Sequence, residues 1–362
     1  MTTDADAPGT HRARRLGFFA RHRRIVICVV IAAVILIGGA GYYAYNLNAK
    51  LGNIDRVNVG PLGDRDADSH KAMNILFLGS DGVRGEKSTA SIAQDAKSGD
   101  WPRGKHRSDT IMVAHITANR KHVYLTSIPR DTFTTIYNDE GKGTDKQKIN
   151  AAFSLYGPSG AISTVENFTG LSMSHMAIMD WGGFKDLSSA VGGVRVYIPE
   201  DSYDDAQNIQ WSKGWHTLKG DRALSYVRTR HGLPEGDFDR IARQQNFMRS
   251  LMHKVLESGS ASNPVKLSNT VEVLTQNLTV DSQWTNGELR SLAMSLRDID
   301  AEDVTFLSLP VAGTQHHPQY GDIVDIDEEQ AAELFDAFEN GTVDNYVAEH
   351  PDAELADSRD VS

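Results

Sequence analysis

The sequence predicts an α/β fold, in which a central, mostly mixed β-sheet is flanked by helices and preceded by one N-terminal transmembrane helix. Short apolar runs at Met73–Leu78, Thr110–Ile116 and His122–Ile128 have the length and composition of buried strands. Longer segments, such as residues 149–169 and Phe238–Leu256, have helical spacing of apolar residues. Because strands and helices alternate along the chain, we expect a sheet whose faces are covered by helices.

A transmembrane helix is predicted over residues 25–45, which contain no charged residue. About 20 residues of helix span the hydrocarbon core of a bilayer. Six arginines lie in residues 1–24, so the positive-inside rule keeps this segment cytoplasmic and places the bulk of the chain outside. The alternative is a cleaved signal peptide, but the apolar stretch exceeds the usual core of about 7–15 residues and no clear A-x-A site follows it. We expect a single-pass protein of the cell membrane.

Composition excludes several classes of protein. The chain has 362 residues with 37 Lys and Arg, 48 Asp and Glu and a formal charge of −11, which argues against a general nucleic-acid binder. The acids concentrate in residues 322–362, and the part before them is nearly balanced. The single cysteine, Cys28, lies in the predicted transmembrane helix, so a disulfide within the external part is impossible. The external part must therefore be stabilised by a hydrophobic core.

These patterns divide the chain into five segments. They are a basic cytoplasmic segment (1–24), the transmembrane helix (25–45), a polar stalk (46–72), an extracytoplasmic α/β domain (73–320) and an acidic C-terminal helix with a disordered tail (321–362). Residues 340–362 have many acids and few apolar residues, which predicts disorder. Residues 84–106 are polar, contain Gly and Pro, and are interpreted as a surface loop.

Basic side chains recur beside the ends of predicted strands and helices. They are Arg107, Arg130, Lys148, Arg228, Arg230 and Arg240. In an open α/β sheet ligands bind at the loops beyond strand ends, so converging loops would place these cations around one pocket. Arginine forks suit phosphate oxygens because they donate two parallel hydrogen bonds. The alternative is that each is a solvated charge, a helix-end cation or half of a structural ion pair, and the residues alone leave this open.

Two further pairs could complete such a phosphate site. Arg240 and Gln244 are four residues apart, so they share one face of a helix, in its first turns where the helix dipole favours an anion. Asp81 and Asp109 lie at predicted strand ends, and two carboxylates beside phosphates would hold Mg²⁺. The alternative for both aspartates is a role in turns or helix caps. Zinc-protease, nucleophile-elbow and P-loop motifs are absent from the sequence.

Seven ordered sequence blocks resemble the LytR-CpsA-Psr family, and their residues are most similar to those of actinobacterial members. They are NILFLGSD, RSDTIMVAHI, YLTSIPRD, KINAAFSLYG, GGV-x-V, LKGDRALSYVRTRH and DFDRIARQQ. The resemblance covers about half of the chain, from Met73 to Leu256. It implies a central sheet flanked by helices, with an apolar pocket for a lipid tail.

The resemblance also implies an activity. Such enzymes are extracytoplasmic phosphotransferases, which take a glycopolymer linked to a polyprenyl pyrophosphate. They pass the glycan with one phosphate to a cell-wall hydroxyl, usually on peptidoglycan, and release polyprenyl phosphate. Arginine side chains and Mg²⁺ suit the charge that develops on the phosphate oxygens. Hydrolysis of the pyrophosphate is expected as a side activity.

Individual roles are carried over by motif. Asp81 and Asp109 match the Mg²⁺-binding aspartates. The residues around the pyrophosphate are matched by Arg107, Arg130, Lys148, Arg228, Arg230, Arg240 and Gln244. Asp131 and Asp239 resemble further members of the site, which either orient the arginines or accept the hydroxyl proton. Two rival functions remain open, a polyprenyl-pyrophosphate hydrolase and a non-catalytic envelope scaffold or regulator.

Overall fold

The computed structural model describes most of the chain. The described residues are 45–46, 48–60, 71–81, 88–234, 236–257 and 264–361. Contacts divide the chain into two compact units, Met1–Ala49 and Lys50–Ser362, and the second contains the sheet. Within the described ranges no helix is both long enough and apolar enough to cross a membrane. All but the last residue of the transmembrane helix predicted at 25–45 lies outside the described residues.

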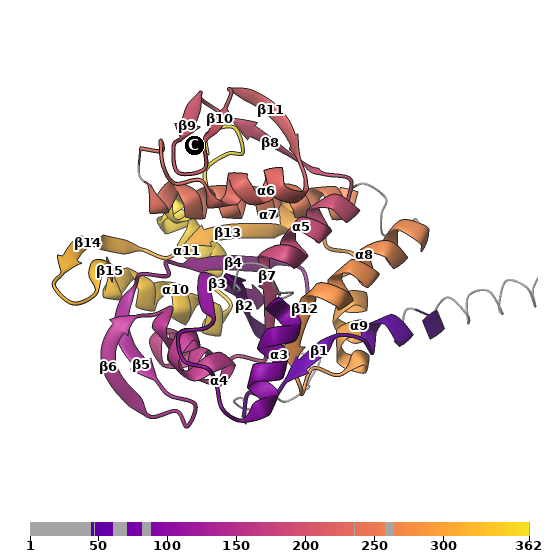
Figure 1. Cartoon of the computed structure of the whole chain (residues 1–362), viewed down its shortest axis with the longest axis horizontal. Coiled ribbons are helices and arrows are strands. Elements are labelled where there is room, and N and C mark those ends of the chain that lie inside the picture. The colour runs from indigo at the N-terminus through magenta and orange to yellow at the C-terminus, as the bar shows by residue number, and fades with distance from the viewer. Residues whose placement is uncertain are drawn as a thin grey trace, which may run out of the picture. The chain divides into compact units, whose positions relative to one another are not determined.

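A seven-stranded mixed sheet forms the centre of the second unit (Figure 1). Its strands, in spatial order, are β1 (Asp55–Val57), β12 (Leu278–Asp281), β7 (His175–Asp180), β2 (Met73–Asp81), β3 (Arg107–Ile116), β4 (Val123–Ile128) and β13 (Val304–Ser308). The pairs β1–β12, β2–β7 and β4–β13 are parallel, and the other neighbours are antiparallel. The predicted mixed sheet is thus confirmed.

One face of the sheet packs against a first group of helices. These are α3 (Ser88–Ser98), α4 (Ala151–Thr169), α10 (Glu328–Asn340) and α11 (Val343–Glu349). Leu76 and Leu78 of β2 point into this core, as the two-residue period of a strand requires. An interruption lies inside α4, where Gly157 has φ +68° in front of Pro158. A Cβ at Gly157 would lie 2.8 Å from the Trp101 ring, so close packing as well as conformation selects glycine there.

The opposite face packs against α7 (Asp237–Glu257) and α9 (Asn286–Ser295), and Ile75 of β2 points into this second core. A third core lies on the outer side of α7. Its elements are α5 (Trp181–Ala190), α6 (Gly220–Arg228), β8 (Val194–Ile198) and β11 (Gly214–Leu218). The helix α8 (Pro264–Asn277) packs beside α5. The sheet is therefore enclosed between helices, as the α/β pattern predicts.

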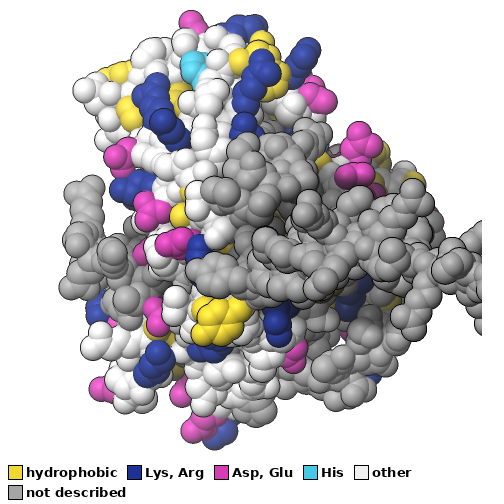
Figure 2. All heavy atoms as spheres, turned by 90° about the vertical axis from the view of Figure 1, so that its right-hand side faces the viewer, with side chains coloured by type: hydrophobic (Ala, Val, Ile, Leu, Met, Phe, Trp, Pro, Cys, Tyr) yellow, Lys and Arg dark blue, Asp and Glu magenta, His cyan; other side chains and the backbone are white. Residues whose placement is uncertain are grey.

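Small sheets and single turns complete the unit. They are β5 (Phe133–Tyr137) with β6 (Gly143–Lys148), β9 (Ser202–Asp204) with β10 (Ile209–Trp211), β14 (Val311–His317) with β15 (Gly321–Ile326), and the 3-10 helices Ala301–Asp303 and Pro351–Ala353. Figure 2 shows one side of the molecule, where Lys and Arg side chains alternate with Asp and Glu over the described atoms and hydrophobic groups are small and separate.

Two segments that the sequence presented as irregular contain regular structure. Residues 55–57 of the predicted stalk form β1, which pairs with β12 at the edge of the sheet. Residues 88–98 of the predicted loop 84–106 form α3, with Ile92 and Ala93 buried against the sheet. The sequence did not predict β1 or α3 because each contributes only a few apolar residues. Most of the core against which they pack comes from the sheet.

The prediction of a disordered tail beyond residue 340 is wrong. Tyr346 and Val361 are 4% and 3% exposed. The backbone N–H of Leu355 donates to the carbonyl of Phe306 at 2.9 Å, and Glu354 forms a bridge with Leu307. The tail therefore covers the outer edge of β13. Its few apolar side chains face inward while the acids remain in solvent, so low mean hydropathy did not mean disorder.

Candidate active site

A β-bulge shapes the start of β3. Gly79 of β2 pairs with Thr110 and Ser80 pairs with Ser108, so Asp109 is the extra residue of the pair. A Cβ on Gly79 would lie 2.8 Å from the Thr110 Cβ, and glycine therefore permits this close approach. Bulges redirect side chains at sheet ends and often lie beside active sites. This one accounts for the placement of Asp109.

Arg130, just after β4, connects three aspartates. Its guanidinium lies 2.6 Å from Asp109, 3.5 Å from Asp131 and 4.0 Å from Asp237. Burial alone would lower the pKa of Arg130, but attraction to these carboxylates outweighs it and the pKa is raised. The side chain is thus a permanent cation held among β3, β4 and α7.

Lys148 joins the same cluster from the β5–β6 hairpin. Its Nζ lies 3.0 Å from the Asp131 carboxylate. Register places Lys148 opposite Phe133, at the point where β5 begins. The Asp131 carbonyl accepts a hydrogen bond from the Val324 N–H at 2.9 Å. Asp131 is therefore held from both sides, and it orients Lys148 and Arg130 together.

Arg240 contributes a buried cation from the first turn of α7. It is 7% exposed, and its Nη2 lies 2.8 Å from Asp237. The pKa of Arg240 is lowered, mainly because the side chain is buried. The positive charges of Arg130 and Arg230 lower this pKa further, whereas the carboxylates of Asp237 and Asp109 raise it without cancelling the effect of burial. The Nε of Arg240 is a buried donor without a hydrogen bond to the described protein atoms. Such donors are rare in folded proteins, and an anion would satisfy this one.

The end of α6 brings two more arginines. Arg228 and Arg230 are exposed, and the Arg228 guanidinium lies 5.8 Å from the centre of the Trp181 ring at the start of α5. Electrostatic repulsion from Arg230 contributes to the lowered pKa of Arg240. Arg107 is exposed at the start of β3, where it pairs in register with Asp81. The side chain of Asp81 lies outside the described part of the structure.

Gln244 and Asp239 are the remaining predicted site residues on α7. The Gln244 amide accepts a hydrogen bond from Thr110 at 3.1 Å and donates one to the carbonyl of Val227 at 3.2 Å. It therefore links β3 to the end of α6. Asp239 is 8% exposed in the first turn of α7. The described contacts give Gln244 a positioning role.

Asp237 is the site residue that sequence reasoning missed. It contacts both Arg130 and Arg240, and so joins the two cations that lie deepest in the cluster. The signal was present, because Asp237 precedes Arg240 by three residues at a helix start, a spacing that favours an ion pair.

Comparison with known proteins identifies the family. The model of the LytR_cpsA_psr family matches residues 44–339. This chain belongs to that family. The cell wall biosynthesis protein LcpA of Corynebacterium glutamicum is 32% identical over 91% of this chain and 69% of its own length. The polyisoprenyl-teichoic acid–peptidoglycan teichoic acid transferase TagV of Bacillus subtilis is 31% identical over 73% of this chain and 65% of its own.

Solved structures of the LytR_cpsA_psr family have the same fold. The crystal structure of B. subtilis TagV matches 75% of this chain with a TM-score of 0.58 and 26% identity. A LytR-Csp2A-Psr enzyme from Actinomyces oris matches 79% with a TM-score of 0.59 at 23% identity, which supports the fold alone. The resemblance inferred from seven short blocks is thus confirmed over a longer region.

Proposed function

We propose that this protein is a phosphotransferase that moves a glycopolymer with one phosphate from a polyprenyl-pyrophosphate carrier to a hydroxyl of peptidoglycan. Family membership and the names of the relatives support this activity. The observation that carries it is the convergence of Arg130, Lys148 and Arg240 from separate elements into one cluster. Clustered cations suit a pyrophosphate, whose cleavage spreads negative charge over its oxygens.

The reaction needs little covalent chemistry from the protein. The acceptor oxygen attacks the phosphorus that bears the glycan, and the bond from that phosphorus to the bridging oxygen breaks. Polyprenyl phosphate leaves, and the hydroxyl proton passes to a base. Arg130, Arg240 and Lys148 hold the phosphate oxygens, with Arg107, Arg228 and Arg230 at the exposed side. Asp131 and Asp237 keep these cations in place, which supplies the positioning on which such a transfer depends.

Asp81 and Asp109 are proposed to hold Mg²⁺. Asp109 fits this role, because its Oδ1 contacts Arg130 while its Oδ2 has no hydrogen-bond partner among the described residues. Mg²⁺ is usually bound by one or two carboxylates together with phosphate oxygens. Phosphate oxygens and water would complete the shell around these carboxylates. The ion would neutralise charge on the phosphate oxygens.

An apolar surface beside the site suits the lipid tail. Phe77 lies in β2, the middle strand of the sheet, yet its side chain is 36% exposed. It is two residues from Ile75 and so lies on the face covered by α7. Its register neighbours are Met112 and Ala177. An exposed aromatic ring at the centre of a sheet indicates an incompletely covered apolar face, which we assign to the polyprenyl chain.

A tethered enzyme fits a tethered donor. We propose that residues 25–45 anchor the chain in the cell membrane with residues 1–24 in the cytoplasm, so that the α/β domain is extracytoplasmic. Tethering both enzyme and polyprenyl carrier to one membrane raises their effective concentration.

The decisive experiment uses the full chain in lipid nanodiscs. It is incubated with a polyprenyl-pyrophosphate-linked sugar, Mg²⁺ and peptidoglycan fragments, and the products are analysed by mass spectrometry. A phosphodiester-linked conjugate that is lost with EDTA and with Arg228→Ala is expected. Free sugar phosphate without any conjugate would instead identify a hydrolase. Absence of all turnover would contradict the proposed activity and favour a scaffold.

A further inference from the structure

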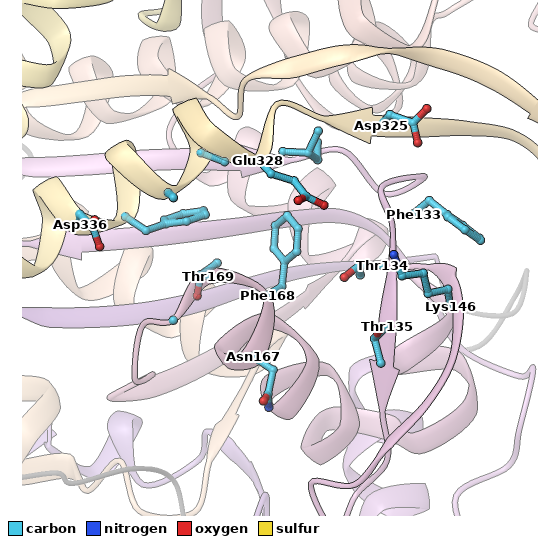
Figure 3. A pocket seen from close by; sticks show the side chains of 15 residues that line it. Phe133, Thr134, Thr135, Lys146, Asn167, Phe168, Thr169, Asp325, Glu328 and Asp336 are labelled. Atoms are coloured by element: carbon cyan, nitrogen blue, oxygen red, sulfur yellow. The ribbon is translucent and has the colours of Figure 1, made fainter.

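A pocket lies on the other face of the sheet from Phe77. It has a volume of about 510 Å³ and is enclosed by the end of α4, the start of α10, β15 and the β5–β6 hairpin. In Figure 3, Phe168 stands between α4 and α10 beneath Glu328, while Thr134 and Thr135 line the opposite wall along β5. Pockets that bind small molecules or sugar units commonly have volumes of about 300–1,000 Å³.

The lining differs in charge from the phosphate site. Three carboxylates, those of Asp325, Glu328 and Asp336, face a single ammonium, that of Lys146. No hydrogen bond or ion pair engages the carboxylates of Glu328 and Asp336 within the described part of the chain. A pocket of this charge repels phosphate groups and favours neutral, hydroxyl-rich or amino-bearing ligands.

Hydrogen-bonding groups and aromatic rings supply the remainder of the lining. Thr134, Thr135 and Asn167 offer polar atoms, and Asn167 retains its carbonyl oxygen because only its NH₂ group bonds, to Ser163 at 2.8 Å. Phe168 forms an edge contact with the ring of Phe335 at 6.3 Å. Polar groups placed beside aromatic and apolar side chains are typical of specific ligand sites.

Two chain segments connect the pocket to the phosphate site. β5 starts two residues after Asp131, at Phe133, which both lines the pocket and lies opposite Lys148. From the other side Val324 bonds to the Asp131 carbonyl, and the next residue, Asp325, lines the pocket. Since a strand rises about 3.3 Å per residue, the first lining residue lies about 7 Å along the chain from Asp131.

The positions of the Phe77 surface and of this pocket distinguish donor from acceptor. Ala331 and Phe335 of the pocket belong to the same core as Leu76 and Leu78, whereas Phe77 lies on the opposite face of β2. The phosphate cluster lies at the end of the sheet, between these faces. Phosphoryl transfer places the attacking and leaving oxygens roughly in line on opposite sides of phosphorus. If the leaving polyprenyl phosphate lies on the Phe77 face, the attacking hydroxyl comes from the face that holds this pocket.

We propose that this pocket binds a sugar unit of the acceptor glycan strand and positions its hydroxyl for attack, an inference that rests on the proposed function. The glycan strand of peptidoglycan has the hydroxyl-rich, phosphate-free chemistry that the lining favours. The cluster of Phe133, His317 and Tyr320, whose rings lie 4.9–5.8 Å apart, extends the surface along the β14–β15 hairpin for neighbouring units.

The test fills the pocket without disturbing the core. Ala332 lines the pocket and is exposed on α10, so Ala332→Trp adds bulk where there is space. Glu339→Trp, at an exposed position of α10 outside the lining, is the matched control. The full chain is assayed for transfer to soluble, uncrosslinked peptidoglycan strands, for donor hydrolysis without acceptor, and for binding of fluorescent strands.

We expect Ala332→Trp to raise the KM for the strands at least tenfold and to abolish strand binding, with donor hydrolysis and melting temperature unchanged. Glu339→Trp should match the wild type in every assay. Wild-type transfer and binding that persist in Ala332→Trp would overturn the acceptor pocket while leaving the proposed function intact. If the wild type forms no conjugate, the proposed function fails, and strand binding lost only in Ala332→Trp would still establish the pocket.

Discussion

The guanidinium of Arg130 lies 2.6 Å from the carboxylate of Asp109, which joins the end of β4 to the bulge of β3. Because both partners are about four-fifths buried, the pair is partly shielded from solvent. The pair uses only the Oδ1 atom of Asp109, so the same aspartate can orient Arg130 and bind a metal ion through its other carboxylate oxygen.

Asp109→Asn tests this double role. The amide keeps the size of the side chain but removes its charge, so we expect the transfer rate to fall about 100-fold, as when one electrostatic group of an active site is lost. The variant should also need more Mg²⁺ for half-maximal activity. A titration of activity against Mg²⁺ measures both effects. Asp298→Asn, at an exposed position outside the cluster, serves as the control, and an unchanged Mg²⁺ requirement in Asp109→Asn would refute the metal assignment.

Arg230→Ala separates function from stability. Arg230 is exposed, so its loss should change the free energy of unfolding by no more than about 0.5 kcal/mol. Transfer should nevertheless fall about 100-fold, because a cation that stabilises the developing phosphate charge is removed. Denaturant melts and initial rates check the two parts. Arg290→Ala, another exposed arginine on α9, should retain full activity; equal losses in both variants would mean a nonspecific effect of charge.

Phe77→Glu tests the surface assigned to the lipid. A charge on this apolar face should raise the KM for a long-chain polyprenyl donor about tenfold or more, since burial of one aromatic side chain is worth about 1.5–3 kcal/mol. Donors with a short prenyl chain should be affected less, and Phe77→Leu should stay near wild type. Kinetics on a series of chain lengths measure this. The assignment would be lost if short and long donors responded equally.

His115 makes stability depend on pH. Burial lowers the pKa of His115 from 6.5 to about 4 in the folded protein. The unfolded chain therefore binds a proton that the folded protein excludes, and stability should fall by roughly 3 kcal/mol as pH drops from 6.5 to 4. His115→Gln, which can keep the hydrogen bond with Asn74, should flatten this slope. Unfolding free energies measured across this range test it, and equal slopes in both proteins would contradict it.

Tyr346→Ala probes the C-terminal segment. The ring is 4% exposed, so its removal should cost about 3 kcal/mol of stability, as for other large buried rings. Glu349→Ala, an exposed site one turn later on α11, should have little effect. Chemical denaturation compares the two. Equal stabilities would mean that the tail does not contribute to the core in solution.

Sequence patterns were sufficient for the central strands and the long helices, because periodicity reports burial on one face. They also placed Arg240 and Gln244 correctly on α7. They could not assign a partner to Gln244, whose amide binds Thr110 and Val227, since these come from distant segments that only tertiary packing brings together. The contact of Asp237 with Arg130 likewise crosses the fold, whereas its spacing to Arg240 was visible in the sequence.

Composition gave the wrong prediction for the C-terminal tail, because a few buried apolar side chains are enough to order it. The tail averages as acidic and polar, yet Leu355 and Val361 are buried because β13 and α7 leave a surface for them. Secondary-structure propensity and charge are properties of the segment alone, whereas its order also depends on the apolar surface that the remainder of the protein provides for packing.

The pairing of Leu355 with Phe306 has a consequence for the order of events in biosynthesis. Translation proceeds from the N-terminus, so β13 is made before the segment around Leu355 that covers its outer edge. An open strand edge is a template for pairing with other chains. The segment around Leu355 thus acts as a closing step, because a chain truncated or stalled before this segment would expose the edge of β13 to pairing with other chains.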